Sequence, residues 1–260
     1  MRLTEIEQIF DTIYPEQINL KSFERKSKLC PAIWRNNDMK RAVRARLMKI
    51  AKDFIEGFEE FPLNAVDIVV VGSIAGYNWS KYSDVDLHII VNFRDYNDYG
   101  TPDVLKALFQ KIKAAWNDKH DIKIFGYEVE IYVQDVDEEN ASDGIYSVMY
   151  GKWNKLPKIK DANLDRELIK TQAAQYINII DKLEELSDRR LSEKQYEILH
   201  ETAKKFNDEI MQGRKTGLAE EGENAPGNIV FKVLRRTEHI GKLKKVITKL
   251  FDKMCSLYSV

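Results

Sequence analysis

The sequence predicts an α+β fold, in which a mixed β-sheet with flanking helices is followed by a C-terminal domain made only of helices. Runs of β-branched or alternating residues lie at 66–71, 86–91 and 122–133, and such runs are typical of strands with at least one buried face. After about residue 160, apolar residues recur only at helical spacing. The order strand, turn, strand, helix, strand therefore predicts one sheet in the N-terminal part of the chain.

An amphipathic helix is expected ahead of the first strand. Its apolar stripe, with steps of three and four residues, consists of Val43, Leu47, Ile50, Phe54, Phe58 and Phe61. Asp38 can cap the helix at its N-terminus, and Pro62 would end it. A short helix is also expected near residues 3–14.

Other helix signals follow along the chain. Thr101 and Pro102 predict a helix start between the second and third strands, because Thr is a good cap and Pro fits the first helical position. The C-terminal helices are expected at about 163–187, 193–212 and 226–256, with the glycine- and acid-rich segment 213–228 as a connection. The resulting division is an extension at 1–37, a domain with the sheet at 38–158 and a helical domain at 159–260.

Composition narrows the class of protein. With 43% hydrophobic and 32% charged residues the chain is expected to fold, and its net charge of −1 does not indicate nucleic-acid binding. The two cysteines, Cys30 and Cys255, are too few for a disulfide framework and too far apart in the chain for a zinc-binding pair. No run reaches the roughly 20 apolar residues of a membrane span, and the N-terminus lacks the apolar region of a signal peptide. We expect a cytoplasmic protein without a membrane partner.

Residues that can carry chemistry concentrate where the first strand ends and the second begins. Gly72 and Ser73 follow the first strand directly. Glycine permits close approach of the backbone to a ligand, and a Ser hydroxyl with neighbouring amides at a turn can hold phosphate oxygens. Asp84 and Asp86 precede and begin the second strand. Because residues two apart in an extended chain point the same way, both carboxylates should face one side, adjacent to this turn.

Paired carboxylates beside a phosphate-binding turn are typical of a magnesium site. Mg²⁺ prefers oxygen ligands and is usually held by one or two carboxylates plus substrate phosphates, so we expect Mg²⁺, or Mn²⁺, as the cofactor. Two-metal chemistry of this kind calls for a third carboxylate. The third strand offers Glu130, which is flanked by Val129 and Ile131, with Glu128 as the alternative.

This constellation resembles the nucleotidyltransferases related to DNA polymerase β. Their pattern is Gly-Ser, a short spacer, Asp-x-Asp between apolar residues and a later acid on another strand, and it is matched here over roughly residues 40–135. This chain has Glu130 where many members have Asp. The resemblance implies the nucleotidyltransferase fold, catalytic and metal-binding roles for Asp84, Asp86 and Glu130, and transfer of a nucleoside monophosphate from a nucleoside triphosphate such as ATP, with release of pyrophosphate.

The wider chain is also similar to uncharacterised nucleotidyltransferase-like proteins of tailed bacteriophages. This similarity rests on the Asp-Leu-His-Ile run that starts at Asp86 and on the segment 217–236. It implies no particular substrate.

Further residues are candidates for nucleotide binding. Lys81 and Ser83 precede the Asp pair and can reach a triphosphate. His88, two residues beyond Asp86, should share the face of the carboxylates, either as a metal ligand or base or as a packing residue.

The predicted last helix carries a basic stripe, made of Lys232, Arg235, Arg236, His239, Lys242, Lys245 and Lys249. The stripe is either a solvated helix face or a nucleotide- or RNA-binding surface. Lys232, Arg235 and Arg236 are the nucleotide-binding candidates.

Two classes of function remain from the sequence alone. The first is a nucleotidyltransferase whose acceptor is a small molecule, a protein hydroxyl, or a nucleotide or RNA end; a pyrophosphokinase-type transfer is a variant of it. The second is a non-catalytic nucleotide-binding or interaction protein on the same fold.

Overall fold

The computed structural model describes residues 12–58, 62–159 and 164–256, and the chain divides into two compact units. One unit, Lys21–Asp161, contains every strand of the described residues, and the other, Met1–Leu20 with Ala162–Val260, contains the C-terminal helices. The predicted fold class, a mixed sheet with flanking helices followed by helices that pack together, is confirmed. The predicted domain limits stay a prediction, and the compact units place residues 21–37 with the sheet.

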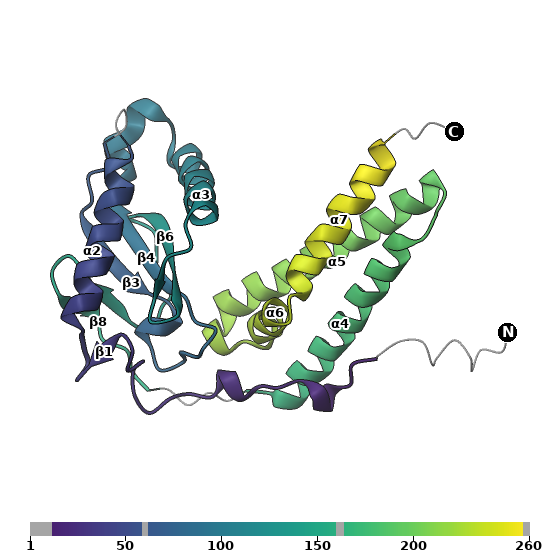
Figure 1. Ribbon diagram of the computed structural model, residues 1–260, viewed down its shortest axis with the longest axis horizontal. Coiled ribbons are helices and arrows are strands. Elements are labelled where there is room, and N and C mark those ends of the chain that lie inside the picture. Colours follow the sequence, from purple (N-terminus) through teal and green to yellow (C-terminus); the bar gives the residue numbers. More distant parts are fainter. Residues whose placement is uncertain (1–11, 59–61, 160–163, 257–260) are drawn as a thin grey trace. The chain divides into compact units, whose positions relative to one another are not determined.

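The main sheet has six strands and is mixed (Figure 1). Its spatial order is β5 (Lys123–Ile124), β6 (Tyr127–Asp135), β4 (Val85–Val91), β3 (Asp67–Val71), β7 (Ile145–Ser147) and β8 (Lys152–Lys155). Strands β4 and β6 run parallel, whereas all other neighbours are antiparallel. A separate small hairpin joins β1 (Trp34–Arg35) to β2 (Asp38–Met39).

The three predicted strand regions are present, with one difference. The third region contains a hairpin, because Phe125 and Gly126 adopt positive φ angles of 52° and 88° and fold β5 back on β6. Paired positive φ angles of this kind are typical of tight hairpin turns. Strands β7 and β8 were not predicted, since β7 has only three residues and β8, Lys-Trp-Asn-Lys, shows no apolar alternation.

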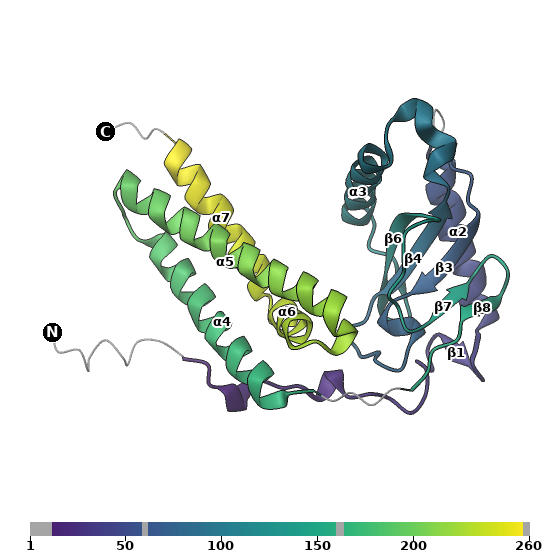
Figure 2. The same cartoon turned by 180° about the vertical axis from the view of Figure 1, so that it is seen from behind.

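Helices α2 (Arg41–Glu56) and α3 (Pro102–Lys119) cover one face of this sheet. Figure 1 shows α2 lying across β3 and β4. The buried face of β4, Val85, Leu87, Ile89 and Val91, belongs to the same core as the apolar stripe of α2. Alternation along β4 places Asp86 and His88 on the opposite face of the sheet. Figure 2 shows the strands of this sheet from behind.

The predicted ends of these helices are corrected in two places. Asp38 does not cap α2: it lies in β2, where its Oδ1 accepts hydrogen bonds from the Tyr146 hydroxyl at 2.6 Å and from the Met39 amide at 2.9 Å. The helix ends at Glu56, before Pro62, and the Gly57 amide closes its last turn. The predicted start of α3 is confirmed, since Thr101 Oγ1 accepts from the Val104 amide. The helix expected near 3–14 falls largely outside the described residues, as does Phe61.

The helical unit differs from its prediction at two points. It contains α4 (Arg166–Asp188), α5 (Glu193–Glu220), α6 (Pro226–Arg236) and α7 (His239–Cys255), besides the short turns η1 (Pro15–Gln17) and η5 (Gly222–Asn224). Helix α5 continues through residues 213–220, which were expected to form a connection. The expected last helix is broken at Glu238, which has a φ of +65°.

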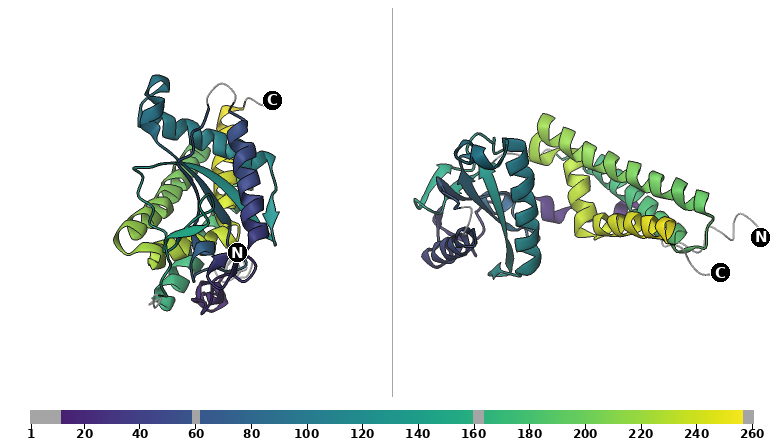
Figure 3. Two further views of the ribbon diagram at one scale, coloured as in Figure 1. Left: turned by 90° about the vertical axis from the view of Figure 1, so that its left-hand side faces the viewer. Right: turned by 90° about the horizontal axis from the view of Figure 1, so that it is seen from above.

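Helix α5 packs against both α6 and α7 (Figure 3). A Cβ atom on Gly227 would lie 2.5 Å from the carbonyl oxygen of Gly213. Glycine at 227 therefore permits the close crossing of α5 and α6. None of the helices within residues 12–58, 62–159 and 164–256 combines the length and apolar surface that a bilayer-spanning helix needs.

The core between α2 and the sheet makes a prediction about stability. Leu47 is fully buried, whereas Leu108 on α3 is 43% exposed. Leu47→Ala should lower the free energy of unfolding of the sheet unit by about 2–5 kcal/mol, because it removes buried methyl groups and leaves a cavity. Urea denaturation measures this, and the matched control Leu108→Ala should change it by no more than about 0.5 kcal/mol. Equal effects of the two substitutions would contradict the packing of α2 against the sheet.

Candidate active site

The turn after β3 is shaped by a close contact between Gly72 and Asp86. Gly72 has φ 73° and ψ −163°, a region that is essentially restricted to glycine. A Cβ atom at this position would lie 1.9 Å from Asp86 Oδ2. The contact follows from strand register, because Val71 and Asp86 are directly paired across β3 and β4. Glycine thus lets the carboxylate of Asp86 lie against the turn.

The same register brings Glu130 next to Asp86. The two residues are partners across the parallel strands β4 and β6, and both side chains are half-buried. Asp84 directly precedes β4 and is also half-buried, while its neighbours Ser83 and Val85 are buried.

Glu128 lies elsewhere on β6. It is exposed and pairs with Lys123 in the edge hairpin. Of the two candidate glutamates, Glu130 is therefore the one adjacent to Asp86.

Asp86 and Glu130 share a face of the sheet without belonging to a closed cluster of acids. In the part of the chain that the structure describes, no three His, Cys, Asp or Glu side chains form a group that could hold a metal ion. Glu130 instead forms an ion pair with Lys113 of α3, with 3.6 Å between Nζ and Oε2. The Lys113 Nζ also lies 5.3 Å from the centre of the Tyr132 ring. Lys113 was not predicted as a site residue, and only its charge on the polar side of α3 could have suggested it.

His88 has the contacts of a packed histidine. Its Nδ1 lies 2.7 Å from Gln134 Oε1, and the Gln134 amide group in turn donates to the carbonyl oxygen of Glu138 at 2.8 Å. The ring packs against Tyr132 with 4.9 Å between ring centres. Burial lowers the pKa of His88, and the nearby Lys113 adds to this effect, while the hydrogen bond to Gln134 opposes it. These contacts favour the packing interpretation over metal ligation.

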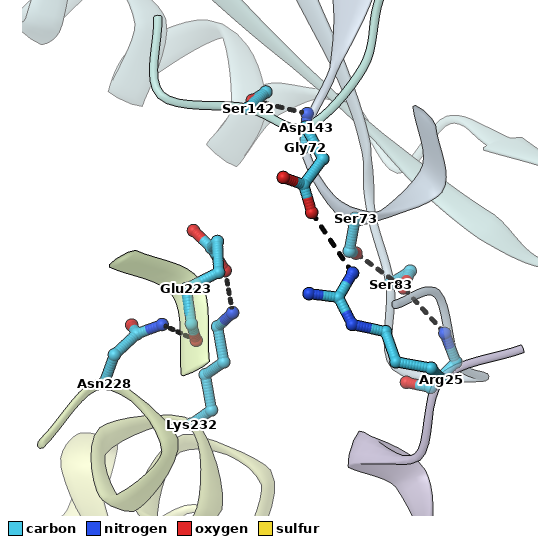
Figure 4. A network of polar contacts seen from close by, with 10 residues as sticks. Arg25, Gly72, Ser73, Ser83, Ser142, Asp143, Glu223, Asn228 and Lys232 are labelled. Carbon is cyan, nitrogen blue, oxygen red and sulfur yellow. Dashed lines mark hydrogen bonds and ion pairs between the residues drawn. The ribbon is translucent and has the colours of Figure 1, made fainter. Parts of the chain in front are cut away.

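Serine hydroxyls hold the loop between the turn and the Asp pair. Ser73 Oγ lies 2.7 Å from Ser83 Oγ, which also accepts a hydrogen bond from the Ser80 amide at 2.9 Å (Figure 4). The Gly72 amide donates to Ser142 Oγ at 3.1 Å. Ser83 is buried, so its immediate role is to hold Ser73. Lys81 is exposed, with its Nζ 4.9 Å from the centre of the Tyr82 ring.

Residues distant in sequence complete the surroundings of the turn. Asp143, which follows Ser142, forms an ion pair with Arg25 at 3.1 Å. Neither Arg25 nor Asp143 was predicted, because no local pattern links them to the turn. Only the folded chain brings them together.

A comparison with protein families identifies the chain. A family model described as a nucleotidyltransferase domain matches residues 47–210. The chain belongs to this nucleotidyltransferase family. The match includes β3, β4 and β6 with the three acids, and it extends through α4 into α5. No curated protein and no solved structure matched the chain.

Membership of this nucleotidyltransferase family supports part of what the sequence predicted. It confirms the resemblance to the polymerase β-related superfamily, and it implies transfer of a nucleoside monophosphate from a nucleoside triphosphate. The similarity to phage proteins stays a prediction.

The predicted basic residues of the nucleotidyltransferase's helical unit have different surroundings. Lys232 forms an ion pair with Glu223, whose backbone oxygen accepts from the Asn228 side chain at 2.8 Å (Figure 4). Arg235 is exposed and Arg236 is half-buried on the same helix, α6.

The α7 part of the basic stripe packs against acids of α4. Lys242 lies 2.7 Å from Asp181 and 2.9 Å from Glu184. Lys249 pairs with Asp188. The prediction of one basic stripe along a single helix is therefore wrong, because the helix is interrupted at Glu238. Lys242 and Lys249 of α7 instead pair with acidic residues of α4.

The contact between Gly72 and Asp86 makes a testable prediction. Gly72→Ala should destabilise the sheet unit by about 1–3 kcal/mol from backbone strain, and the added clash with Asp86 should increase this loss. Gly126→Ala is the matched control, because Gly126 also has a positive φ but no atom lies within 4 Å of its added Cβ. Chemical denaturation should show the larger loss for Gly72→Ala. An equal loss in both variants would mean that the close approach of Asp86 contributes nothing.

Proposed function

We propose that the protein is a catalytically active, Mg²⁺-dependent nucleotidyltransferase that transfers a nucleoside monophosphate from a nucleoside triphosphate to a nucleophilic acceptor. The observation that carries the proposal is the register of three adjacent strands. Val71 pairs with Asp86, and Asp86 pairs with Glu130. Two carboxylates therefore lie side by side at the turn formed by Gly72 and Ser73.

The donor set suits the proposed cation. Asp84, Asp86 and Glu130 offer only oxygen ligands, which Mg²⁺ and Mn²⁺ favour over the nitrogen and sulfur ligands typical of zinc. Mg²⁺ sites are usually completed by substrate phosphates, so carboxylates that line one face without a closed cluster are compatible with binding together with the triphosphate. When bound, the cation would neutralise phosphate charge and lower the pKa of an acceptor hydroxyl.

The proposed reaction is a substitution at the α-phosphorus. An acceptor oxygen forms a bond to the α-phosphorus, and the bond from that phosphorus to the bridging oxygen breaks. Pyrophosphate leaves with the electron pair of the broken bond, and the proton of the acceptor passes to solvent.

The side chains proposed for phosphate binding are considered unit by unit. In the sheet unit, the Ser73 hydroxyl would donate to a phosphate oxygen while Ser83 holds it in place, and Lys81 would supply a cation. In the helical unit, Lys232, Arg235 and Arg236 are the residues proposed to bind nucleotide.

The acceptor belongs to one of three chemical classes: a small molecule, a protein hydroxyl, or the end of a nucleotide or RNA. Each class leaves a different product mass. Mass spectrometry of the products formed from the four nucleoside triphosphates in a cell extract identifies the acceptor and the preferred base together.

The catalytic proposal predicts pyrophosphate release that depends on Asp86. With Mg²⁺ or Mn²⁺ and each labelled nucleoside triphosphate, the wild type should release pyrophosphate. Asp86→Asn should slow this release by about 100-fold or more, since a lost metal ligand removes several kcal/mol of transition-state stabilisation. Asp118→Asn, at an exposed position on α3, is the control.

Three outcomes would contradict this assignment. Equal rates in wild type and Asp86→Asn would remove the catalytic role of the carboxylate. Release of nucleoside monophosphate in place of pyrophosphate would indicate pyrophosphokinase chemistry. Binding of nucleotide without turnover of any triphosphate would favour a non-catalytic nucleotide-binding protein.

The choice of third carboxylate is tested by a matched pair of variants. Glu130→Gln should lower the rate of pyrophosphate release by about tenfold or more, because it removes a negative charge next to Asp86. Glu128→Gln should leave the rate within about twofold of wild type, since Glu128 lies in the exposed edge hairpin. The reverse ranking in a steady-state assay would assign the role to Glu128.

A further inference from the structure

The segment before α2 is bonded to the loop that follows Gly72. The Lys26 amide donates to the carbonyl oxygen of Tyr77 at 2.7 Å. The indole nitrogen of Trp79 donates to the carbonyl oxygen of Lys28 at 2.8 Å, and that of Trp34 donates to the carbonyl oxygen of Ile74 at the same distance. Residues 21–35 are therefore part of the structure around the turn, although the sequence suggested only an extension.

Within this segment, Arg25 is a largely buried cation next to the turn. The side chains of Arg25 and Asp143 are only 10% and 12% exposed, and the Arg25 Nη1 lies 3.1 Å from Asp143 Oδ2. Asp143 directly follows Ser142, whose hydroxyl accepts from the Gly72 amide. Figure 4 shows the guanidinium directed at Asp143, beside Ser73 and Ser83.

The hydrogen bonding of Arg25 leaves a donor to be explained. Among the described residues, Arg25 Nε is buried and has no hydrogen-bond partner. Buried donors in folded proteins nearly always have partners, so an orphan donor calls for a ligand, a water molecule or a functional reason. A guanidinium has a planar set of donors that matches a phosphate group in a bidentate manner.

We propose that Arg25 is a triphosphate-binding residue, which Asp143 holds beside the turn of Gly72 and Ser73. The inference rests on the proposed function, because it assumes that the triphosphate lies at this turn. Arg25 donates hydrogen bonds to phosphate oxygens, and the carboxylate of Asp143 orients the guanidinium and balances its charge before the substrate binds.

The experiment uses the full chain and inorganic tripolyphosphate with Mg²⁺, so that neither a base nor an acceptor is needed. Isothermal titration calorimetry gives the dissociation constant. Arg25→Met should weaken binding about 10- to 100-fold, the range expected when hydrogen bonds to a charged group are lost. Arg35→Met is the control: Arg35 is exposed in the same segment, and its loss should change binding by no more than about twofold.

A second variant separates ligand binding from a purely structural ion pair. Asp143→Asn keeps an oxygen that can accept from the guanidinium but removes the charge that competes with phosphate. Tripolyphosphate should then bind as tightly as to wild type or more tightly. This second test also holds if Arg25→Met does not fold.

Two results would overturn the inference. One is a folded Arg25→Met variant that binds tripolyphosphate within about twofold of wild type. The other is a folded Asp143→Asn variant that binds tripolyphosphate about 10-fold or more weakly than wild type, since the pair would then serve only to hold the loop. A chain that binds tripolyphosphate through Arg25 but releases no pyrophosphate would refute the proposed enzymatic activity and leave this inference standing.

Discussion

The pairing register of β3, β4 and β6 is the constraint on which the candidate site depends. Because side chains alternate between faces, a shift of one residue in β4 would turn Asp86 into the core and expose Leu87. The register is held by the buried face of β4, which packs under α2 and α3. The burial of apolar residues thus positions the carboxylates on the other face, and Gly72 supplies the space that Asp86 requires.

Around this register, hydrogen bonds and ion pairs from distant segments shape the turn. Ser142 binds the Gly72 amide, Ser83 binds Ser73, and Trp34 binds the backbone at Ile74. These contacts hold the turn and its loop through residues from three separate parts of the chain. They also explain why residues 21–37 belong to the compact unit of the sheet, with Arg25 beside the turn.

The fold class and the central motif were predictable because their signals are local. The β-branched run of β3, the alternation in β4 and the order Gly-Ser, Asp-x-Asp are each contained in a short window, and the family match covers them. The prediction that Asp38 caps a helix was wrong because the contact that decides its position is not local. A side chain that suits a cap was used in a long-range hydrogen bond to Tyr146, which no local pattern reveals.

The C-terminal helices show a similar limit. Helical spacing predicted that these helices exist, but Glu238 interrupts the last one. Basic side chains of α7 that could have formed a binding surface instead form ion pairs with α4. Glycine residues at 213 and 217, which suggested a connection, lie within a helix, and Gly217 packs closely against Ala225. Packing between helices outweighed the weak local preference of glycine against helix.

By itself, the sequence determined the three main strand regions, most of the helices, the face of β4 on which Asp86 lies and the nucleotidyltransferase motif, because periodicity and motif spacing are properties of neighbouring residues. The tertiary structure decided that Glu130 rather than Glu128 lies beside Asp86, that Lys113 pairs with Glu130, and that Arg25 and Asp143 form a largely buried pair at the turn. These contacts join residues from separate elements, and their partners are chosen by strand register and burial, which only the folded chain establishes.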